Sequence, residues 1–236
     1  MKKSTLSLVF IFLSSILGHI NVQSSPSSVL AELSAESHLI SLISSNTANI
    51  DLIIPEREIL SYGIKGYLHL QQQDQLPEGK PLTVIDFSLP SNEKRMWIID
   101  VADGKILHHG YVSHGRNSGD LLAQKFSNLN SSYMSSLGFY LTGETYQGKH
   151  GYSLRLDGLE KGINDNARER AIVIHGADYA KEDFIKQTGR LGRSLGCPAL
   201  PRELANQIID LIKDKSCLFI YGKDDSYLIE SSILNT

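Results

Sequence analysis

Short runs of branched and aromatic residues, separated by turn-forming residues, dominate the sequence from Pro81 onward. Runs of this kind, about four to eight residues long, are typical of β-strands. Asp103-Gly104 lies between two of them, which is a strong hairpin signal. The runs are not regularly interleaved with helical patterns, so we predict a mainly β fold, an antiparallel β-sandwich or barrel with an inserted helix. The predicted strands are 82–87, 96–101, 105–112, 137–142, 152–156, 171–175, 217–221 and 227–230.

Helical spacing of apolar residues is clearest over residues 201–213, where Leu204 and Ile208 share a face and a proline suits the first turn. Two weaker helices are predicted nearer the N-terminus, over 26–49 and from 55 to about 73. They carry no recognisable chemistry and form a helical leader that packs on the main body or fades into linker.

The first residues have the pattern of an export signal. Met1-Lys2-Lys3 is basic, Leu6–Leu17 is apolar, and small residues follow near Ser24. The apolar stretch is too short for a comfortable membrane span. We predict an exported protein, periplasmic or associated with the cell envelope, without a stable membrane span once the signal is cleaved. An uncleaved anchor is the alternative.

These patterns divide the chain into a signal peptide at 1–24, a helical leader or linker at 25–80 and a strand-rich domain at 81–236, which contains the candidate catalytic residues described below. With 41% hydrophobic and 21% charged residues, the composition is that of an ordinary globular protein. The formal net charge of −3 gives no indication of a nucleic-acid partner.

The sequence contains two cysteines, Cys197 and Cys217. In an exported protein the default interpretation of such a pair is a disulfide. The surroundings of Cys197 favour a nucleophile instead: Gly196 permits a tight turn, and Pro198 biases the thiol residue away from helical conformation. Cys217 begins an apolar strand and is predicted to be a buried thiol.

A candidate base for this thiol is His175, which ends a predicted strand, precedes a glycine and lies 22 residues before Cys197. A Cys–His pair activates a thiol as a thiolate–imidazolium couple. From the spacing alone, a catalytic histidine and a structural one are equally favoured.

Several sequence blocks, in one order, resemble the YkuD-type L,D-transpeptidases, and in particular the branch known as the murein L,D-transpeptidase catalytic domain family. The resemblance covers roughly residues 83–222. The blocks are Trp97–Asp100, Ser113–Gly119, Ser136–Tyr140, Gly148–Leu154, Asn164–Arg170, His175–Tyr179 and Gly189–Pro198.

The resemblance implies that Cys197 attacks a tetrapeptide stem of peptidoglycan, with His175 as its base. Release of D-Ala would leave an acyl-enzyme that passes to an amine acceptor. Backbone N–H groups of the loop containing Ser194, Leu195 and Gly196 would stabilise the oxyanion. The implied partners are peptidoglycan stem peptides, and no metal or organic cofactor is required. Tentative substrate contacts are His114, His150, Tyr152, Arg155 and Arg193.

The sequence departs from the commoner YkuD signature, Ser/Thr-His-Gly-Cys followed closely by arginine. Leu195 replaces that histidine, and Pro198-Ala199 replaces the residues leading to the arginine. Arg190 or Arg193 is our candidate for the missing cation. Arg168 and Arg170 are further candidates for gripping stem carboxylates, although a solvated surface charge is at least as well favoured for each arginine.

Three other functions compete with transpeptidation. An L,D-carboxypeptidase would use water as the acceptor, and a wall-binding domain would keep the fold without catalysis. A metal hydrolase would use some of the histidines, but no HExxH motif or tight ligand spacing is present. The histidines available for it are His108, His109, His114, His150 and His175.

Overall fold

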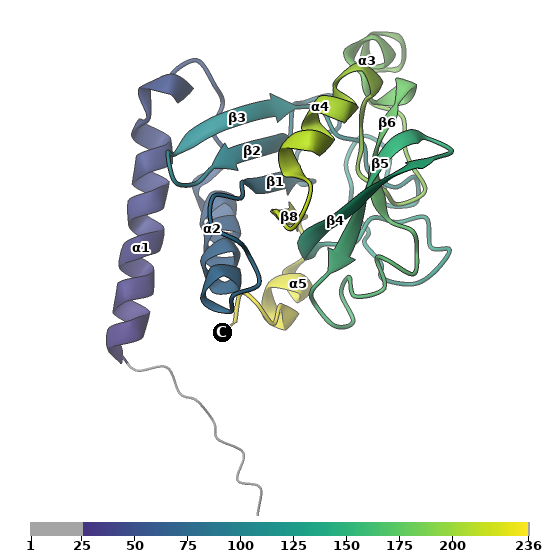
Figure 1. Ribbon diagram of the computed structural model, residues 1–236. Helices are drawn as coiled ribbons and strands as arrows, with labels where there is room; N and C mark the ends of the chain where they lie inside the picture. Colours follow the sequence, from purple (N-terminus) through teal and green to yellow (C-terminus); the bar gives the residue numbers. More distant parts are fainter. Residues whose placement is uncertain (1–25, 236) are drawn as a thin grey trace, which may run out of the picture.

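The structure, a computed structural model, describes residues 26–235, so the predicted signal peptide lies outside the described residues. Eight strands form one sheet in the order β3-β2-β1-β8-β4-β5-β6-β7 (Figure 1). The strands are β1 Leu82–Asp86, β2 Met96–Asp100, β3 Lys105–Gly110, β4 Gly138–Gly148, β5 Gly151–Gly158, β6 Val173–Ala177, β7 Ala199–Pro201 and β8 Cys217–Tyr221.

Most neighbouring strands are antiparallel, but β1 pairs with β8 and β6 pairs with β7 in parallel. An isolated bridge between Ser113 and Ala199 joins the segment after β3 to β7, so the two edges of the sheet meet. The mainly β fold with a helical N-terminal segment is confirmed, and the sheet is mixed rather than wholly antiparallel. β6 and β7 run parallel because η2 and α3 connect them and return the chain in the same direction, whereas β1 and β8 are distant in sequence.

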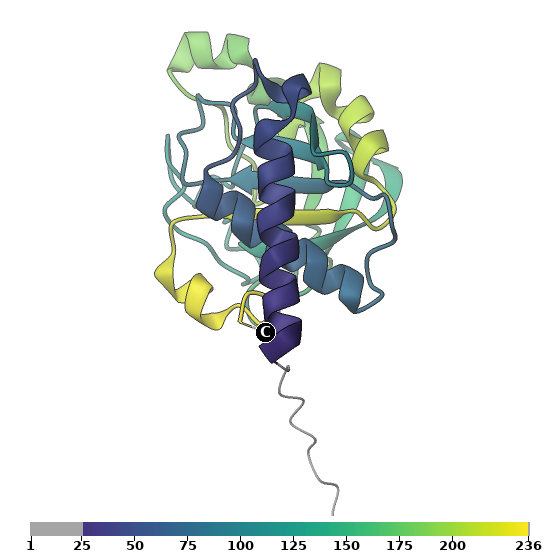
Figure 2. The same cartoon turned by 90° about the vertical axis from the view of Figure 1, so that its left-hand side faces the viewer.

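Helices cover the outside of this sheet. The two N-terminal helices lie on one side, with α1 crossing that face in Figure 2. The predicted helix over 201–213 is confirmed as α4, which follows β7. The helical elements are α1 Pro26–Ser45, η1 Thr47–Asn49, α2 Arg57–Gln72, η2 Asp178–Ala180, α3 Glu182–Thr188, α4 Arg202–Ile212 and α5 Asp225–Glu230. Among the described residues, none of these helices has the length and hydropathy to cross a bilayer.

The last predicted strand, 227–230, is wrong, because these residues belong to α5. Asp224 caps this helix by accepting a hydrogen bond from the Ser226 N–H at 3.0 Å. Tyr227 turns inward and donates to the buried Glu160 carboxylate at 3.2 Å. A local cap and one buried anchor therefore override the apolar pattern of a very short segment.

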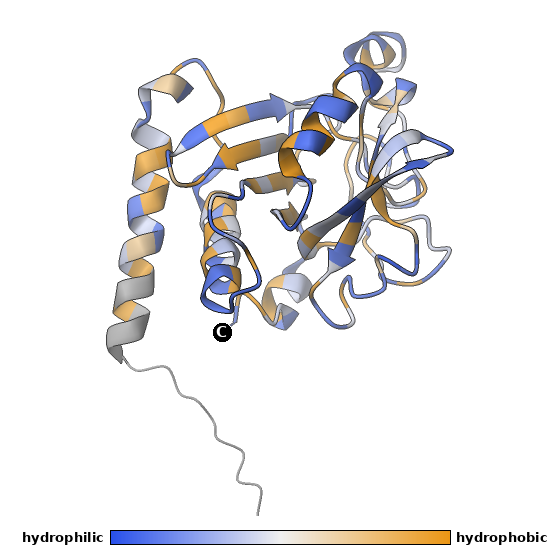
Figure 3. Ribbon diagram, in the orientation of Figure 1, coloured by the Kyte–Doolittle hydropathy of each residue, from blue (hydrophilic) through white to orange (hydrophobic). Residues whose placement is uncertain are grey.

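The core lies between α2 and the centre of the sheet. Figure 3 shows mostly hydrophobic residues on the central strands and both hydrophobic and hydrophilic residues along the helices. Phe139 and Phe219 stack there with ring centroids 4.4 Å apart. A Cβ on Gly66 would lie 2.1 Å from Cε1 of Phe139, so this glycine lets α2 approach the sheet closely. The helix buries Ile64 and Leu70 in the same cluster, which makes the predicted leader segment part of the core.

Candidate active site

The loop that carries the candidate nucleophile Cys197, residues 194–199 (the nucleophile loop), leads into β7 and is bonded to the segment that follows β3. The Ser194 N–H donates to the His114 carbonyl at 3.0 Å, and the Ser113 N–H donates to the Ala199 carbonyl at 2.8 Å. Both ends of the loop are therefore fixed by backbone hydrogen bonds.

Gly196 occupies the tightest point of the loop. Its φ of +125° favours glycine. A Cβ there would lie 2.8 Å from the Met134 carbonyl oxygen and 3.0 Å from Ile172 Cδ1. Gly115 is equally confined, since its Cβ would lie 2.9 Å from the Gly196 Cα. Two glycines thus allow the backbones to touch directly beside Cys197.

The Cys197 thiol is partly exposed and rests on the chain at the start of β6. Its Sγ accepts a hydrogen bond from the Val173 N–H at 3.4 Å and donates to the Ala171 carbonyl at 3.7 Å. Cys197 is not in a disulfide.

His175 lies in the middle of β6 with only 2% of its surface exposed. Its Nδ1 is 3.1 Å from the Gly176 carbonyl, which can only accept, so Nδ1 carries the proton. The neutral ring then presents an unprotonated Nε2, the form a general base requires. The His150 ring stacks on it, with centroids 4.3 Å apart.

The pairing of β6 with β7 brings His175 and Cys197, the dyad, close together, since the Cα partner of His175 is Ala199, two residues after Cys197. The thiol is bonded to the N–H of Val173, which lies two residues before His175 on β6. The Val173 and His175 side chains share one face of this strand, the dyad face. Among the described residues, no hydrogen bond joins the two side chains, because the thiol is bonded to the Ala171 carbonyl. Catalytic hydrogen bonds commonly tighten only when substrate binds.

Burial has opposite consequences for the pKa values of the dyad. It raises the pKa of the Cys197 thiol, while the Val173 N–H and then Arg170 oppose the rise. It lowers the pKa of His175, with the Gly176 carbonyl acting in the other direction. The resting pair therefore favours a neutral thiol and a neutral imidazole over the thiolate–imidazolium couple expected from the sequence.

The Gly196 N–H, expected to face the oxyanion, is already engaged. It donates to Ser194 Oγ at 3.0 Å, and the same hydroxyl donates to the Cys197 carbonyl at 2.6 Å. Ser194 is therefore a turn-stabilising residue. Within the described loop, the Leu195 and Cys197 N–H groups remain available as oxyanion donors.

Two of the tentative substrate contacts lie on opposite faces of β5. Arg155 pairs with Val173 across the sheet and so shares the face of the dyad. Tyr152 has the other parity, and its hydroxyl donates to the Asp210 carboxylate of α4 at 2.8 Å. The structure therefore brings Arg155 to the dyad face and places Tyr152 on the opposite one.

The arginines near this face are paired with carboxylates. Arg155 lies 3.0 Å from Glu144 and also over the Tyr146 ring, 4.5 Å from its centroid. Arg168 contacts Glu144 at 2.9 Å and Asp157. Exposed pairs of this kind are worth at most about 1 kcal/mol, so an incoming carboxylate can replace them.

The other proposed contacts are held elsewhere. His114 is fully buried, and burial followed by the charge of Arg95 lowers its pKa to about 3. Its Nδ1 is 2.8 Å from Arg95 Nη2, so the ring anchors the segment after β3. Arg190 and Arg193 both pair with Asp120, at 2.8 Å and 3.0 Å, which leaves neither directed at the thiol.

Arg170 is a cation near the thiol, as is Lys149, and the sequence did not reveal the proximity of either. Its guanidinium donates to the carbonyls of Ser127 and Met134, both at 2.7 Å, and so ties the preceding loop together. Its charge also lowers the pKa of Cys197. Only the folded chain brings it there, because the residues it binds are far apart in sequence.

The two cysteines lie on opposite sides of the closed sheet. Three strands separate Cys197, before β7, from Cys217 of β8 in the strand order. A disulfide requires Cα atoms within about 7 Å, so the pair cannot form without rearrangement. Cys217 is fully buried, as predicted. Among residues 26–235, no group of three or more His, Cys, Asp or Glu side chains is arranged to hold a metal ion.

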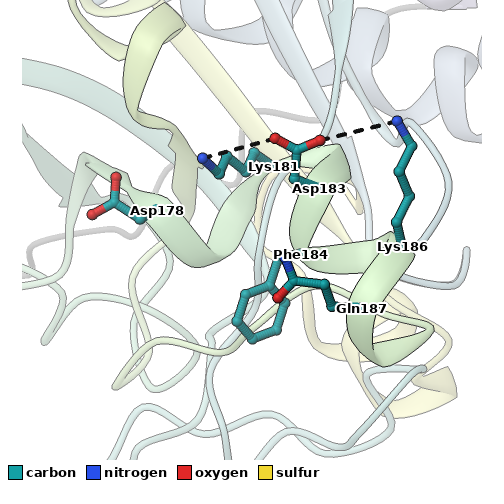
Figure 4. A pocket seen from close by; sticks show the side chains of 6 residues that line it. All are labelled: Asp178, Lys181, Asp183, Phe184, Lys186 and Gln187. Atoms are coloured by element: carbon teal, nitrogen blue, oxygen red, sulfur yellow. Dashed lines mark ion pairs between the residues drawn. The ribbon is translucent and has the colours of Figure 1, made fainter.

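A surface cavity of about 460 Å³ lies beside the end of β6, along η2 and α3. In Figure 4, Asp183 lies between Lys181 and Lys186, with an ion pair to each. Neither dyad residue lines it. Burial, and after it a negative charge on Cys197 when the thiol is ionised, raises the pKa of Tyr179 in η2 to about 12.

Solved structures similar to this chain include several L,D-transpeptidases. One from Mycobacterium smegmatis is 14% identical, with 60% of this chain and 58% of that chain covered and a TM-score of 0.39. L,D-transpeptidase 3 from Mycobacterium tuberculosis, in complex with a faropenem-derived adduct, is 15% identical, with 59% of each chain covered and a TM-score of 0.38. One from Stackebrandtia nassauensis is 14% identical, with 80% of this chain and 92% of that chain covered and a TM-score of 0.37.

No curated protein matches the chain. This chain spans less than two thirds of the length of the Mycobacterium smegmatis structure. The profile of the L,D-transpeptidase catalytic domain matches residues 54–221, which is more than half of the chain and includes α2, the whole sheet and both dyad residues. The chain therefore belongs to the L,D-transpeptidase catalytic domain family.

Proposed function

We propose that this protein is a cysteine-dependent peptidoglycan L,D-transpeptidase with Cys197 as nucleophile and His175 as general base. The observation that supports the proposal is the hydrogen bond from the Val173 N–H to the thiol, which holds Cys197 beside the strand that carries an imidazole of fixed tautomer. Membership of the family supports the reaction class.

The reaction begins when the thiol leaves the Ala171 carbonyl and gives its proton to Nε2 of His175. The sulfur attacks the carbonyl that precedes D-Ala in a tetrapeptide stem. The N–H groups of Leu195 and Cys197 stabilise the resulting oxyanion. Collapse breaks the C–N bond, and His175 returns the proton to the departing amine of D-Ala.

The thioester is then attacked by an amine of a second stem, which regenerates the thiol and leaves a cross-link. His175 accepts the proton of the incoming amine and delivers it to the sulfur. Because the dyad is neutral at rest, the base acts at the moment of attack rather than storing a thiolate.

Arg155 is our candidate for binding a carboxylate of the stem. It shares the dyad face and lies opposite Val173, whose N–H touches the thiol. Its exposed partner Glu144 can be exchanged for a substrate carboxylate. His150, stacked on His175, forms the neighbouring wall. Such a substrate requires export to the cell envelope, in keeping with the predicted signal peptide.

The direct test is incubation of the purified protein with defined tetrapeptide muropeptides, followed by mass analysis of the products. A cross-linked dimer with loss of D-Ala is expected. Tripeptide and free D-Ala alone would indicate an L,D-carboxypeptidase, and no product would favour a wall-binding domain. Cys197→Ala is the matched control, since a dimer formed by that variant would contradict the proposed nucleophile.

A further inference from the structure

Ser135 is a buried serine outside the nucleophile loop whose hydroxyl bridges two backbones. It has 1% of its surface exposed. Its Oγ accepts from the Gly115 N–H at 3.0 Å and donates to the Gly196 carbonyl at 3.1 Å. One hydroxyl thus joins the segment after β3 to the residue before the nucleophile.

The bond to the Gly196 carbonyl fixes the orientation of the next amide. The described chain contains no cis peptide bonds, so the Gly196–Cys197 peptide is trans and planar. In such a peptide, the carbonyl and the N–H point in opposite directions. Because the carbonyl points at buried Ser135, the Cys197 N–H points away from it.

That N–H lies on the side where the reaction takes place. Among the described residues, this N–H donates no hydrogen bond to another residue, and it belongs to the residue that carries Sγ. An oxyanion forms on the carbon bonded to this sulfur and is therefore within reach of the Cys197 N–H. The Ser194–Leu195 peptide is oriented in the same way. Its carbonyl, that of Ser194, accepts from the Arg116 N–H at 2.8 Å, so its N–H, that of Leu195, points away from Arg116.

Ser135 is itself rigidly held. Its backbone is fixed by two hydrogen bonds: the Ser135 N–H donates to Ser118 Oγ at 2.9 Å, and the Ser135 carbonyl accepts from the Ser127 N–H at 3.0 Å. Gly115 and Gly196 touch beside it, so no water-sized gap separates the two backbones. Its hydroxyl is thus preorganised to hold one orientation of the loop.

We infer that Ser135 is a positioning residue for the oxyanion hole, acting through the Gly196 carbonyl to aim the Cys197 N–H at the reacting carbonyl. The inference rests on the proposed function and goes beyond it, because it assigns the orientation of the Cys197 N–H donor to a residue remote in sequence. Ser135 does not touch the substrate, and it does not contact the thiol.

The test compares two reactions of Cys197 in the full chain. Acylation by imipenem passes through an oxyanion, whereas alkylation by iodoacetamide needs only the thiol. In Ser135→Ala, we expect acylation to slow about 10- to 100-fold, below the loss of about 10²- to 10³-fold for a deleted donor. Alkylation at Cys197 should stay within about twofold of wild type.

Ser216→Ala is the matched control, because this serine is equally buried and its hydroxyl has no hydrogen-bond partner among the described residues. It should change neither rate. Ser135→Thr keeps the hydroxyl and should restore most of the acylation rate. Where Ser135→Ala does not fold, Ser135→Cys offers a weaker donor of similar size, with the same selective loss expected.

Two outcomes would overturn the inference alone, and a third would overturn the proposed function on which it rests. Equal slowing of both reactions would reduce Ser135 to a structural support of the loop, and an unchanged acylation rate would remove its role. Wild-type protein that imipenem does not acylate would overturn the proposed function itself. A reactive wild type with an equally reactive Ser135→Ala would overturn only the role of Ser135.

Discussion

The core under α2 and the nucleophile loop are both tightly packed, yet different forces hold them. Under α2, side chains such as Phe139 and Phe219 pack against each other and against a helix brought close by Gly66. In the loop, the contacts are hydrogen bonds to backbone groups and direct contact between backbones at Gly115 and Gly196.

The difference separates stability from catalysis. Apolar packing contributes free energy in proportion to the area buried but leaves direction loosely defined. A hydrogen bond to a backbone carbonyl contributes only about 1 kcal/mol, but it fixes the plane of a peptide. We therefore expect substitutions in the core to change unfolding and substitutions in the loop to change the reaction.

The largest effect is expected for His175→Ala. Loss of the general base should lower the rate of acylation by imipenem about 10²- to 10⁴-fold. The free energy of unfolding should change little, because among the described residues the ring makes one hydrogen bond to the backbone and stacks on one other ring. Stopped-flow acylation and urea unfolding measure the two quantities. Acylation within threefold of wild type would contradict the assigned base.

Phe139→Ala should lower the stability of the fold and leave the acylation rate nearly unchanged. Truncating this buried ring should lower the free energy of unfolding by about 3–5 kcal/mol. Acylation per folded molecule should stay within about twofold, because the ring lies on the α2 side of the sheet. A loss of more than tenfold in the acylation rate of the folded Phe139→Ala variant would contradict the separation of core stability from catalysis.

Gly66→Ala tests how closely α2 must approach the sheet. The new methyl would meet the Phe139 ring at 2.1 Å, so we expect a loss of about 1–3 kcal/mol in spite of the better helix propensity of alanine. Gly63→Ala is the matched control on the same helix. Its Cβ would meet Val84 at 3.2 Å, and the change should stay within about 1 kcal/mol.

The smallest effect concerns pH. In the proposed mechanism neutral His175 is the base, so acylation should fall as pH drops through its pKa, which burial holds below the usual 6.5. At pH 6.5 the acylation rate should therefore still exceed half of the plateau that it reaches at higher pH.

His150→Ala removes a group that lowers the pKa of His175 and exposes the His175 ring to solvent. The midpoint of the acid-side fall in acylation should therefore move to higher pH by less than about one unit. His69→Ala, in the last turn of α2, should leave this midpoint in place, and a shift to lower pH in His150→Ala would contradict this account.

Local signals explain what the sequence predicted well. Asp103-Gly104 encodes its hairpin in two residues, and residues 201–213 encode an amphipathic helix through spacing alone. The alternation along β5 even separates Tyr152 from Arg155, although both were predicted as substrate contacts. The strand predicted at 227–230 was wrong because a side-chain cap outweighed the pattern.

Long-range geometry explains what the sequence did not reveal. Ser135 lies in a stretch rich in serine, and nothing local distinguishes it from Ser132 or Ser136. Arg170 was predicted as one of several candidates for gripping a stem carboxylate, but its position beside the thiol was not predicted. The engagement of the Gly196 N–H by Ser194 depends on how one loop turns, which no residue pattern specifies. Such bonds become visible only when distant segments meet.

The central claim is that Cys197 performs acyl transfer, and peptide mapping by mass spectrometry after reaction with imipenem tests it most directly. We expect one adduct per chain, on the peptide containing Cys197, with Cys217 unmodified and no adduct in Cys197→Ala. An adduct on Cys217, or an unmodified Cys197 in folded and reduced protein, would contradict the account.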